Sequence, residues 1–545
     1  MKKIILLINT IRYLKAEQIL YRLIYKFKPC TKLGDRTDVQ TSNFRHTLIE
    51  SETNESTYVG NGKFKFLNEE GLGTDWCDCS KSKLWLYNLN YFDDFNSISS
   101  TERKALHIEL MLSWIKHNPV GALNSWEAYP ISLRIVNWIK WLDKNRDFTD
   151  TRVTNSLYIQ TSFLSKNIEY HILGNHLFCN AKALIFSGVF FGGDEAKKWL
   201  DLGIKLIDRE LEEQVLNDGG NFELSPMYHN IFVKDLLDLI NLSVATENTE
   251  LLRRVKKWVE VAGSMLTWAQ KLTHPDGEIG FFNDSAFGIA PKISKLIDYA
   301  ARLDIKPFDL SIGSNVSTDY FKDSGYIALR SCNFFAILDV AKIGPDYLPG
   351  HAHADSLSFE LSIFGHRVFV NSGTSQYGIS DERLRQRKTA AHNTVEVDGC
   401  DSSQVWSGFR VAKRAYPSTP LVISQHGSVN VKCTHNGYKR LPGKVTHKRK
   451  WDMRKGEICI EDELLGSYKE AFAHYHIHPD ITIKHADEDR GLVLTLPDER
   501  FVYVKATSKI KIESTTWHPE FGKVLPNKKL LLPIVDNKLK VTIRF

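Results

Sequence analysis

The sequence predicts a multidomain protein in which an all-α part is followed by an antiparallel β part. The chain has 545 residues, and single hydrophobic cores stop growing near ~250–300 residues, so more than one domain is expected. From about residue 80 to about 310, apolar residues recur at intervals of three and four, which is typical of helices. After about residue 325 the pattern changes to short alternating segments between turn residues, which is typical of strands.

The helical part contains eight segments with a helical period, separated by turn-rich stretches such as NPVGALNS and NDGGNFELSP. These segments are 102–117, 131–143, 153–170, 176–190, 196–216, 228–246, 250–271 and 291–303. Short links between helices predict stacked helical hairpins, although the period alone does not decide whether the hairpins close into a ring.

The β part consists of short segments such as GYIALR, LSFELSIF, EICIEDELL and KLKVTIRF, spaced by Gly, Asp, Asn and Pro. This pattern predicts an antiparallel sandwich. We therefore expect three regions: an N-terminal helical arm and polar loop over 1–60, a helical domain over 61–315 and a β-sandwich over 316–545.

Composition excludes few functions. The chain is 42% hydrophobic and 25% charged, and its net charge of +6 is only a mild bias toward anionic partners. The basic residues are dispersed and no nucleic-acid motif is found, so nucleic acid is not an expected partner. The eight cysteines form no CxxC pair, which favours reduced thiols and a reducing compartment.

The N-terminus begins like a signal peptide, with MKKIILLINTI. However, Arg12 and Lys15 follow at once, and no small-residue cleavage site precedes AEQILYRLIYKF. This favours a retained basic amphipathic helix and a cytoplasmic protein, with a periplasmic or secreted protein as the alternative. Such a helix is compatible with transient contact with a membrane surface. No run is long enough to span a bilayer.

The stretch GHAHADSLSFEL carries the strongest chemical signal. Apolar and polar residues alternate from Leu357 to Leu361, which predicts a strand. If the strand reaches back, His351, His353 and Asp355 project to one side. Imidazoles bind zinc and similar metals and move protons near neutral pH. The alternative is a polar strand edge with satisfied histidines.

Two stretches of the helical part add candidates. LGNHLFCNAKAL places Asn175 and His176 at the start of a helix, where simple capping by Asn is the alternative. DGGNFELSPMYHN places Glu223 after a Gly-rich turn and opens a further helix with Tyr228 and His229. The alternative for Tyr228 and His229 is a structural position at the edge of the hydrophobic core.

Three further stretches are weaker. LNSWEAYPISLRIVNW crowds polar and aromatic residues into a helix entrance, namely Trp126, Glu127, Tyr129 and Arg134. HPDGEIGFFNDS is a loop with the carboxylates Asp276, Glu278 and Asp284. In the β part, His353, Asn371 and His392 could converge on one cation, although their spacing fits no zinc-finger pattern.

Together these motifs resemble the heparinase II/III-like polysaccharide lyases, a group that includes oligoalginate lyases and glycosaminoglycan lyases. The matching elements are WEAYPISLRIVNW, GNHLFCNAKAL, ELSPMYHN, GHAHADSLSFEL, VNSGT and AAHNTVEVDG, in the order of the family and over about residues 80–410. The resemblance implies an N-terminal (α/α) toroid followed by an antiparallel β-sandwich, in agreement with the helix-then-strand pattern. It is more specific for the family than for the substrate.

The resemblance also implies roles for individual residues. Asn175 matches the asparagine that contacts the uronate carboxylate, and His176 matches the adjacent histidine. Tyr228 matches the catalytic tyrosine and His351 the catalytic histidine. The residues expected at the substrate are Trp126, Glu127, Tyr129, Arg134 and Glu223, with Glu127 and Arg134 in the cleft wall.

A metal site, usually of zinc, is implied as well. His353 and His392 match two ligands. Asn371 stands where the family usually has Asp, and an amide oxygen is a weaker, neutral ligand. The implied role of the metal is structural, because it would hold the loop that carries His351.

The implied activity is β-elimination on a uronic-acid-containing polysaccharide, which leaves a 4,5-unsaturated uronate end. The substrate would be glycosaminoglycan-like, alginate-like or a bacterial surface glycan. Tyr228 would protonate the leaving O4, and on one stereochemical course would also remove the C5 proton. His351 is the base for the other course.

Three alternatives stay open from the sequence. One is an intracellular protein of surface-polysaccharide biosynthesis with the same fold. A second is a non-catalytic glycan-binding homologue. The third is a hydrolase of the toroid class, which needs two carboxylates flanking the bond, for example Glu127 with Glu223 or Asp276.

Overall fold

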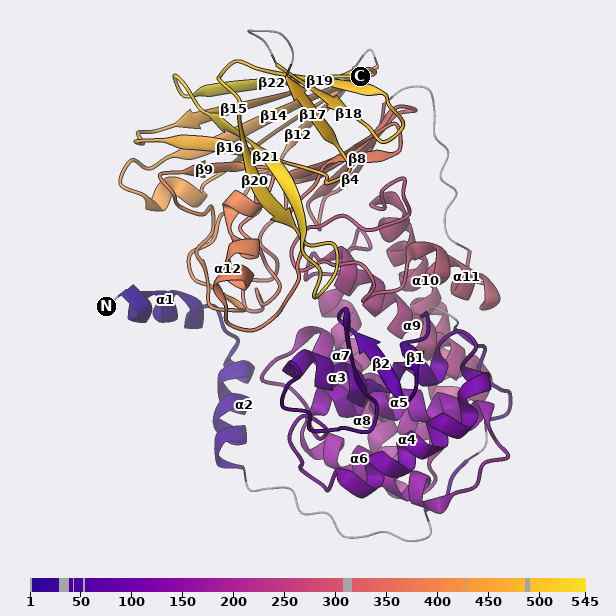
Figure 1. The fold of residues 1–545 in the computed structure, drawn as a ribbon. Helices are drawn as coiled ribbons and strands as arrows, with labels where there is room; N and C mark the ends of the chain where they lie inside the picture. The colour runs from indigo at the N-terminus through magenta and orange to yellow at the C-terminus, as the bar shows by residue number, and fades with distance from the viewer. Residues whose placement is uncertain are drawn as a thin grey trace.

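The computed structural model describes residues 2–28, 39–42, 44–51, 54–306, 316–425, 427–485 and 491–545. They form a helical half and a β half that lie end to end, with two N-terminal helices at their side (Figure 1). These two helices are α1 (Lys2–Ile11) and α2 (Ala16–Phe27). The expected helical arm is therefore present.

A small three-stranded sheet follows where the sequence predicts a polar loop. Its strands are β1 (Tyr58–Gly60), β2 (Lys63–Phe66) and β3 (Glu69–Leu72). The reason is the alternation in KFKF, since Phe64 and Phe66 are buried while Lys63 and Lys65 are exposed. The Phe66 ring packs edge-on against Trp85 of the helical half, at 5.3 Å between centroids.

The helical half contains all eight expected segments as helices. They are α4 (Lys104–His117), α5 (Ala128–Lys144), α6 (Thr151–Lys166), α7 (Gly174–Phe190), α8 (Asp194–Gln214), α9 (Pro226–Thr246), α10 (Thr249–Lys271) and α11 (Ile293–Arg302). One helix that the period did not reveal, α3 (Lys83–Tyr91), precedes them. Helix α7 packs along α8, and α9 along α10, as sequential pairs.

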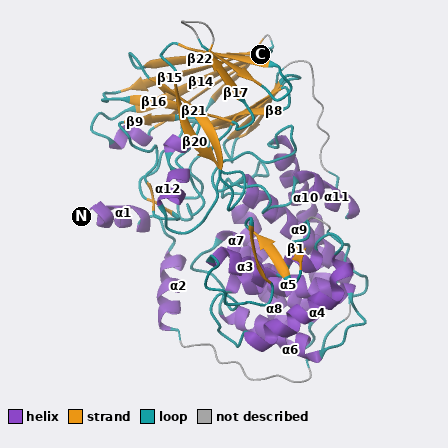
Figure 2. Cartoon of the chain, viewed as in Figure 1, coloured by secondary structure: helices purple, strands orange, loops and turns teal. Residues whose placement is uncertain are grey.

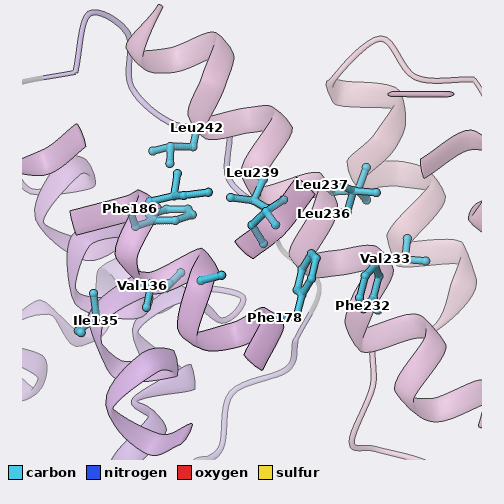
Figure 3. Close-up of a cluster of buried hydrophobic side chains, with 14 of the residues drawn as sticks. Ile135, Val136, Phe178, Phe186, Phe232, Val233, Leu236, Leu237, Leu239 and Leu242 are labelled. Carbon is cyan, nitrogen blue, oxygen red and sulfur yellow. The ribbon is translucent and has the colours of Figure 1, made fainter. Parts of the chain in front are cut away.

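The core of this half lies where α5, α7 and α9 meet (Figure 3). Phe178 of α7 and Phe232 of α9 are both essentially buried, and their ring centroids are 4.1 Å apart. Burial of a side chain of this size stabilises by roughly 1.5–3 kcal/mol. Helix α9, which begins at the candidate catalytic tyrosine, is thus anchored along its length.

The β half is an antiparallel sandwich of two large sheets (Figure 2). One sheet has the order β12-β13-β14-β15-β22-β19-β18-β17, and the other β20-β21-β16-β8-β7-β6-β5-β4, with β9 paired to β16. Apolar residues from both sheets form one core, as the strict alternation of burial in β14 and β15 illustrates. The fold class expected from the sequence is confirmed.

The bounds of the strands follow the expected segments. The first sheet contains β12 (Leu421–Gln425), β13 (Ser428–His435), β14 (Thr446–Arg454), β15 (Glu457–Leu465), β17 (Thr482–His485), β18 (Leu492–Thr495), β19 (Phe501–Ala506) and β22 (Lys538–Arg544). The second contains β4 (Ser317–Phe321), β5 (Tyr326–Arg330), β6 (Phe334–Asp339), β7 (Phe359–Ile363), β8 (His366–Phe369), β9 (Val395–Val397), β16 (Ala471–Ile477), β20 (Lys511–Trp517) and β21 (Leu525–Pro533).

The segment with the histidines is not the start of a strand, contrary to the expectation. Strand β7 begins at Phe359, and residues 350–358 form a loop in which Leu357 takes a left-handed φ of 61°. The loop is tied to residues 283–284 rather than to a neighbouring strand. The Asn283 side chain accepts the backbone N–H of His353 at 3.0 Å, and Asp355 accepts the backbone N–H of Asn283 at 3.3 Å.

Candidate active site

Tyr228 and His351 meet where the helical half faces the loop 350–358. Tyr228 lies in the first turn of α9, where Ser225 caps the helix by accepting its backbone N–H at 3.2 Å. The rings of Tyr228 and His351 stack, with their centroids 3.9 Å apart. One side chain from each half of the molecule thus reaches the same point.

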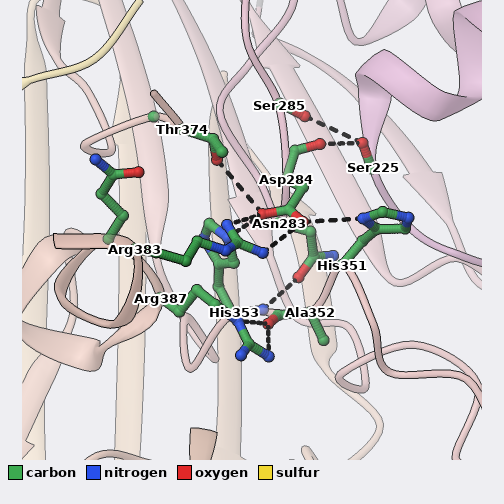
Figure 4. Close-up of polar contacts among 12 residues, drawn as sticks. Ser225, Asn283, Asp284, Ser285, His351, Ala352, His353, Thr374, Arg383 and Arg387 are labelled. Atoms are coloured by element: carbon green, nitrogen blue, oxygen red, sulfur yellow. Dashed lines mark hydrogen bonds and ion pairs between the residues drawn. The ribbon is translucent and has the colours of Figure 1, made fainter. Parts of the chain in front are cut away.

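Asp284 organises the histidine side of this site (Figure 4). It is fully buried, and its two carboxylate oxygens lie 2.9 Å from His351 Nδ1 and 2.8 Å from His353 Nε2. Arg383, also fully buried, donates to both oxygens. Burial alone would raise the pKa of Asp284, but the Arg383 guanidinium and the histidine hydrogen bonds hold that pKa well below its usual range.

An ionised Asp284 fixes the tautomer of His351. A carboxylate only accepts hydrogen bonds, so the His351 hydrogen lies on Nδ1 and Nε2 keeps its lone pair. The Nε2 atom lies 3.5 Å from Glu223, and the His351 side chain is 20% exposed. His351 is therefore arranged as a base with a free nitrogen.

Glu223 joins this pair to the start of α7. Its Oε1 accepts the backbone N–H of Asn175 at 3.1 Å, and its other oxygen is the one facing His351. The preceding residue must be glycine, because Gly174 has a φ of 57° and an added Cβ would lie 2.5 Å from Leu348 and 2.7 Å from Glu223. Close approach at Gly174 thus brings Asn175 to the site.

Asn175 and His176 are held by aromatic and acidic neighbours. Asn175 donates from Nδ2 to the Tyr129 hydroxyl at 3.0 Å, and the His176 ring packs on Tyr129 with centroids 4.4 Å apart. His176 Nδ1 lies 3.1 Å from Glu169. Burial acts to lower the pKa of His176, but Glu169 outweighs it and the pKa is raised. The site therefore presents an amide donor beside an imidazole that favours its cationic form.

Tyr377 is a neighbour that the sequence did not single out, although it lies three residues after the VNSGT motif. Its hydroxyl is 2.9 Å from the Tyr228 hydroxyl. Burial raises the pKa of Tyr228 and of Tyr377, so both phenols keep their protons at neutral pH. Arg383, which follows in α12 (Asp381–Arg387), had no sequence signal at all.

Not every expected substrate residue reaches the site. Arg134 is fully buried and donates to Gln160, Asn90 and Ser125, and Trp126 is 6% exposed and donates to the Asn118 carbonyl. Both are core residues, so their assignment to substrate contact is wrong. Glu127 lies at the surface, paired with Lys83 and Tyr87. Tyr129 and Glu223 are the two that contact the central groups.

His353 and His392 face each other with 3.1 Å between His353 Nδ1 and His392 Nε2. The opposite nitrogen of each ring lies 2.8 Å from a pure acceptor, Asp284 for His353 and the Lys388 carbonyl for His392. The ring hydrogen of each neutral imidazole is thus donated to that acceptor, and the lone pairs of His353 Nδ1 and His392 Nε2 point at each other. This arrangement fits a bound cation, since two ligand atoms at 2.0–2.1 Å from tetrahedral zinc lie roughly 3.3 Å apart.

The third expected ligand, Asn371, fits less well. Its amide oxygen accepts the backbone N–H of Asn393 at 3.0 Å, and its buried Nδ2 has no hydrogen-bond partner. Among the residues that the structure describes, no group of three His, Cys, Asp or Glu side chains surrounds a common point. The donor set for a cation is therefore two imidazoles and, at most, one neutral amide.

Family profiles match nearly the whole of this architecture. The profile described as Heparinase II/III N-terminus matches residues 87–303, and the one described as Heparinase II/III-like, C-terminal, matches residues 315–545. The chain belongs to the heparinase II/III-like family. The division between the two profiles coincides with the change from helices to strands.

Curated relatives of this heparinase II/III-like chain carry a single name. A heparin-sulfate lyase of Bacteroides stercoris is 27% identical over 347 residues, covering 59% of this chain and 48% of the relative. A heparin-sulfate lyase of Pedobacter heparinus is 27% identical over 320 residues, covering 52% of this chain and 46% of the relative. The chain spans about half the length of the curated relatives it matches.

Solved structures agree in fold. A crystal structure of heparinase III has a TM-score of 0.70 at 17% identity, covering 96% of this chain and 88% of that one. Heparan sulfate lyase of Pedobacter heparinus has a TM-score of 0.59 at 17% identity, covering 86% of this chain and 78% of that one. The helical half thus has the toroid fold of this family, followed by its β-sandwich.

Proposed function

We propose that this heparinase II/III-like protein is a polysaccharide lyase that cleaves a uronic-acid-containing polysaccharide by β-elimination. The observation that carries the proposal is the stacking of Tyr228 on His351, with Asn175 joined to the same point through Glu223 and His176 beside Asn175 on Tyr129. The names of the curated relatives make a glycosaminoglycan the first substrate class to test.

In the proposed mechanism, the site activates the C5 proton of a bound uronate. Removal of that proton places negative charge on the adjacent carboxylate, where Asn175 and cationic His176 would stabilise it. His351 Nε2 would take the proton, because the hydrogen bond from Nδ1 to Asp284 makes Nε2 the basic nitrogen of the neutral ring. The resulting imidazolium would lie between two carboxylates, Asp284 and Glu223.

Tyr228 completes the elimination. Its phenol is protonated at neutral pH and would donate its proton to O4 as the glycosidic bond breaks. Tyr377, hydrogen-bonded to it, positions the hydroxyl. On the opposite stereochemical course Tyr228 would have to lose its own proton before it could remove the C5 proton, and its raised pKa opposes that loss, so the course with His351 as base is the one proposed.

A divalent metal, with zinc as the first candidate, is proposed between His353 and His392. It would be structural and would hold the loop that carries His351. Asn371 would offer at most a neutral amide oxygen, so the proposed site is weaker than one with a carboxylate.

A cytoplasmic location remains our proposal, supported by the cysteine pattern and by the lack of a recognisable cleavage site in the sequence.

The direct test is Tyr228→Phe. Loss of the phenolic proton should lower kcat roughly 10²- to 10⁴-fold, because the proposed acid for the leaving oxygen is removed. The readout is absorbance of the unsaturated product on a panel of glycosaminoglycans, alginate and bacterial surface glycans, with a thermal melt to show that the fold is intact. Tyr320→Phe, on a strand outside the site, is the matched control.

Each alternative has its own signature in that panel. Full activity of Tyr228→Phe would remove the tyrosine from the mechanism. New reducing ends without the absorbing product would indicate hydrolysis. Glycan binding without any product from the wild-type chain would indicate a binding protein.

A further inference from the structure

The two N-terminal helices expose an apolar surface that the proposed lyase chemistry does not use. Ten large hydrophobic side chains of α1 and α2 are exposed, which is a concentration found nowhere else in the described chain. We call them the N-terminal apolar surface: Ile4, Ile5, Leu7, Ile8, Ile11, Ile19, Leu20, Leu23, Ile24 and Phe27. Exposed apolar groups gathered in this way mark an interaction site rather than ordinary surface.

The opposite faces of the same helices are fixed to the body of the protein. The Tyr21 ring of α2 stacks on Tyr170 at 4.5 Å between centroids, and Tyr25 donates its hydroxyl to the Ile168 carbonyl. In α1, Thr10 donates to the Val411 carbonyl at 3.2 Å and accepts from Trp406 Nε1 at 3.1 Å. The apolar side chains therefore point outward because the polar and aromatic ones are committed inward.

The charge of this segment identifies the kind of partner. Residues 2–28 contain seven lysines or arginines and one acidic residue, Glu17. Glu17 pairs with Arg209 of the helical half, and Lys15 pairs with Glu213. These two residues of the segment are therefore offset by the body of the protein, and the other six basic residues carry the charge of the segment. A helix with an apolar face and basic flanks lies in the interface of an anionic bilayer, where apolar burial and charge attraction act together.

We propose that the N-terminal apolar surface docks on an anionic membrane surface. Among the described helices, none combines the length and apolar character that crossing a bilayer demands. The contact is therefore one in which α1 and α2 lie along the lipid headgroups. Figure 1 shows both helices at one side of the molecule, outside the helical half and the sandwich.

Docking would also set the position of the candidate active site. Helix α2 packs on residues 168–171, and Glu169 within this segment contacts His176. The site therefore lies directly behind the docked helix. Docking would thus present a glycan near the membrane to the site. This presentation rests on the proposed function, whereas the docking itself does not.

The test is vesicle binding by the full chain, measured by co-sedimentation. We expect binding to vesicles of phosphatidylglycerol and phosphatidylethanolamine, little binding to pure phosphatidylcholine, and weaker binding as salt is raised. Leu20→Glu with Leu23→Glu should weaken binding roughly tenfold or more, because two charges enter the apolar face. Leu123→Glu is the matched control, since Leu123 is 83% exposed in a loop of the helical half.

Three results would overturn the proposal. They are failure of the wild-type chain to bind the anionic vesicles, equal binding by the double variant, and equal binding to phosphatidylcholine. A dimer in lipid-free buffer that the double variant disperses, without vesicle binding, would assign the surface to a second copy instead. Thermal melts of both variants show that the body is folded, and activity on soluble glycan keeps this result separate from the lyase proposal.

Discussion

At the scale of single residues, the two histidines of the site have carboxylate neighbours in different surroundings, since Asp284 is itself paired with the buried Arg383 whereas Glu169 has His176 as its ion-pair partner. Asp284 accepts from His351 Nδ1 and leaves a free nitrogen suited to a base. Glu169 contacts His176 and raises its pKa, which favours a cation suited to binding a carboxylate. The same residue type thus acquires two roles because each imidazole has a different acidic neighbour.

The role of His176 predicts a pH effect. Since Glu169 raises the pKa of His176, the cation persists below that raised pKa and is lost as the pH rises through it. Glu169→Gln removes the attraction, so the alkaline limb of kcat/KM should move to lower pH. The measurement is the pH profile of product formation on one glycosaminoglycan.

Asp208→Asn is the control for this profile, because Asp208 pairs with Arg254 at the surface, away from the site. A limb that stays in place in Glu169→Gln, or that moves equally in the control, would contradict the cationic role of His176.

Motifs predicted the residues that act, but not the residues that hold them. Asn175, Tyr228 and His351 stand in recognisable local patterns. Arg383 does not, and Asp284 is only one of three carboxylates in a weak loop motif, because their importance comes from a tertiary approach of segments far apart in sequence. The errors at Trp126 and Arg134 have a related cause. A polar and aromatic helix entrance looks the same in sequence whether it faces a cleft or a core.

At the scale of elements, periodicity predicted well wherever a segment has one buried face. Strands β13, β14 and β15, in which buried positions alternate with more exposed ones, belong to this class. The prediction of a strand over residues 350–358 is wrong, because the alternation begins only at Leu357. The residues before it bind to another segment of the chain. There His353 and Asp355 bind the loop at Asn283, and a loop with side-chain anchors needs no strand partner.

The same loop predicts metal dependence. If the proposed metal is present, His392→Ala should remove it and lower the thermal midpoint, since the cation would link the loop to the segment around residue 392. Asn371→Asp should raise affinity roughly tenfold or more, because a carboxylate replaces a neutral amide. The measurements are metal content per chain by elemental analysis and melting with and without chelator.

His366→Ala is the control for metal content, because His366 lies at the surface in contact with Asp498. Wild-type and His392→Ala chains with the same metal content, or melting that ignores chelator in the wild type, would exclude this site.

At the scale of the whole molecule, the site exists only while the two halves are docked. Tyr228, Asn175 and Glu223 come from helical elements, whereas His351, Tyr377 and Arg383 come from the β half. Further contacts hold the junction, among them the Tyr326 hydroxyl donating to the Leu224 carbonyl at 2.7 Å. Neither half alone would therefore carry the proposed chemistry.

Asp284 is the charged centre of that junction, and this predicts a stability effect. Asp284→Asn would leave the Arg383 guanidinium fully buried without its counter-charge. Breaking a buried pair in this way costs about 3–5 kcal/mol of the free energy of unfolding. Urea unfolding followed by circular dichroism measures it, and Asp208→Asn, in a partly exposed pair, should cost no more than about 1 kcal/mol.

A double-mutant cycle decides whether the unpaired charge is the cause. If it is, Arg383→Met added to Asp284→Asn removes the uncompensated cation, and the double variant should be more stable than Asp284→Asn alone. If the junction instead depends on the shape of the two side chains, the losses add and the double variant is the least stable of the set. The recovered stability should come without recovered activity, because His351 still lacks the carboxylate that keeps Nε2 free.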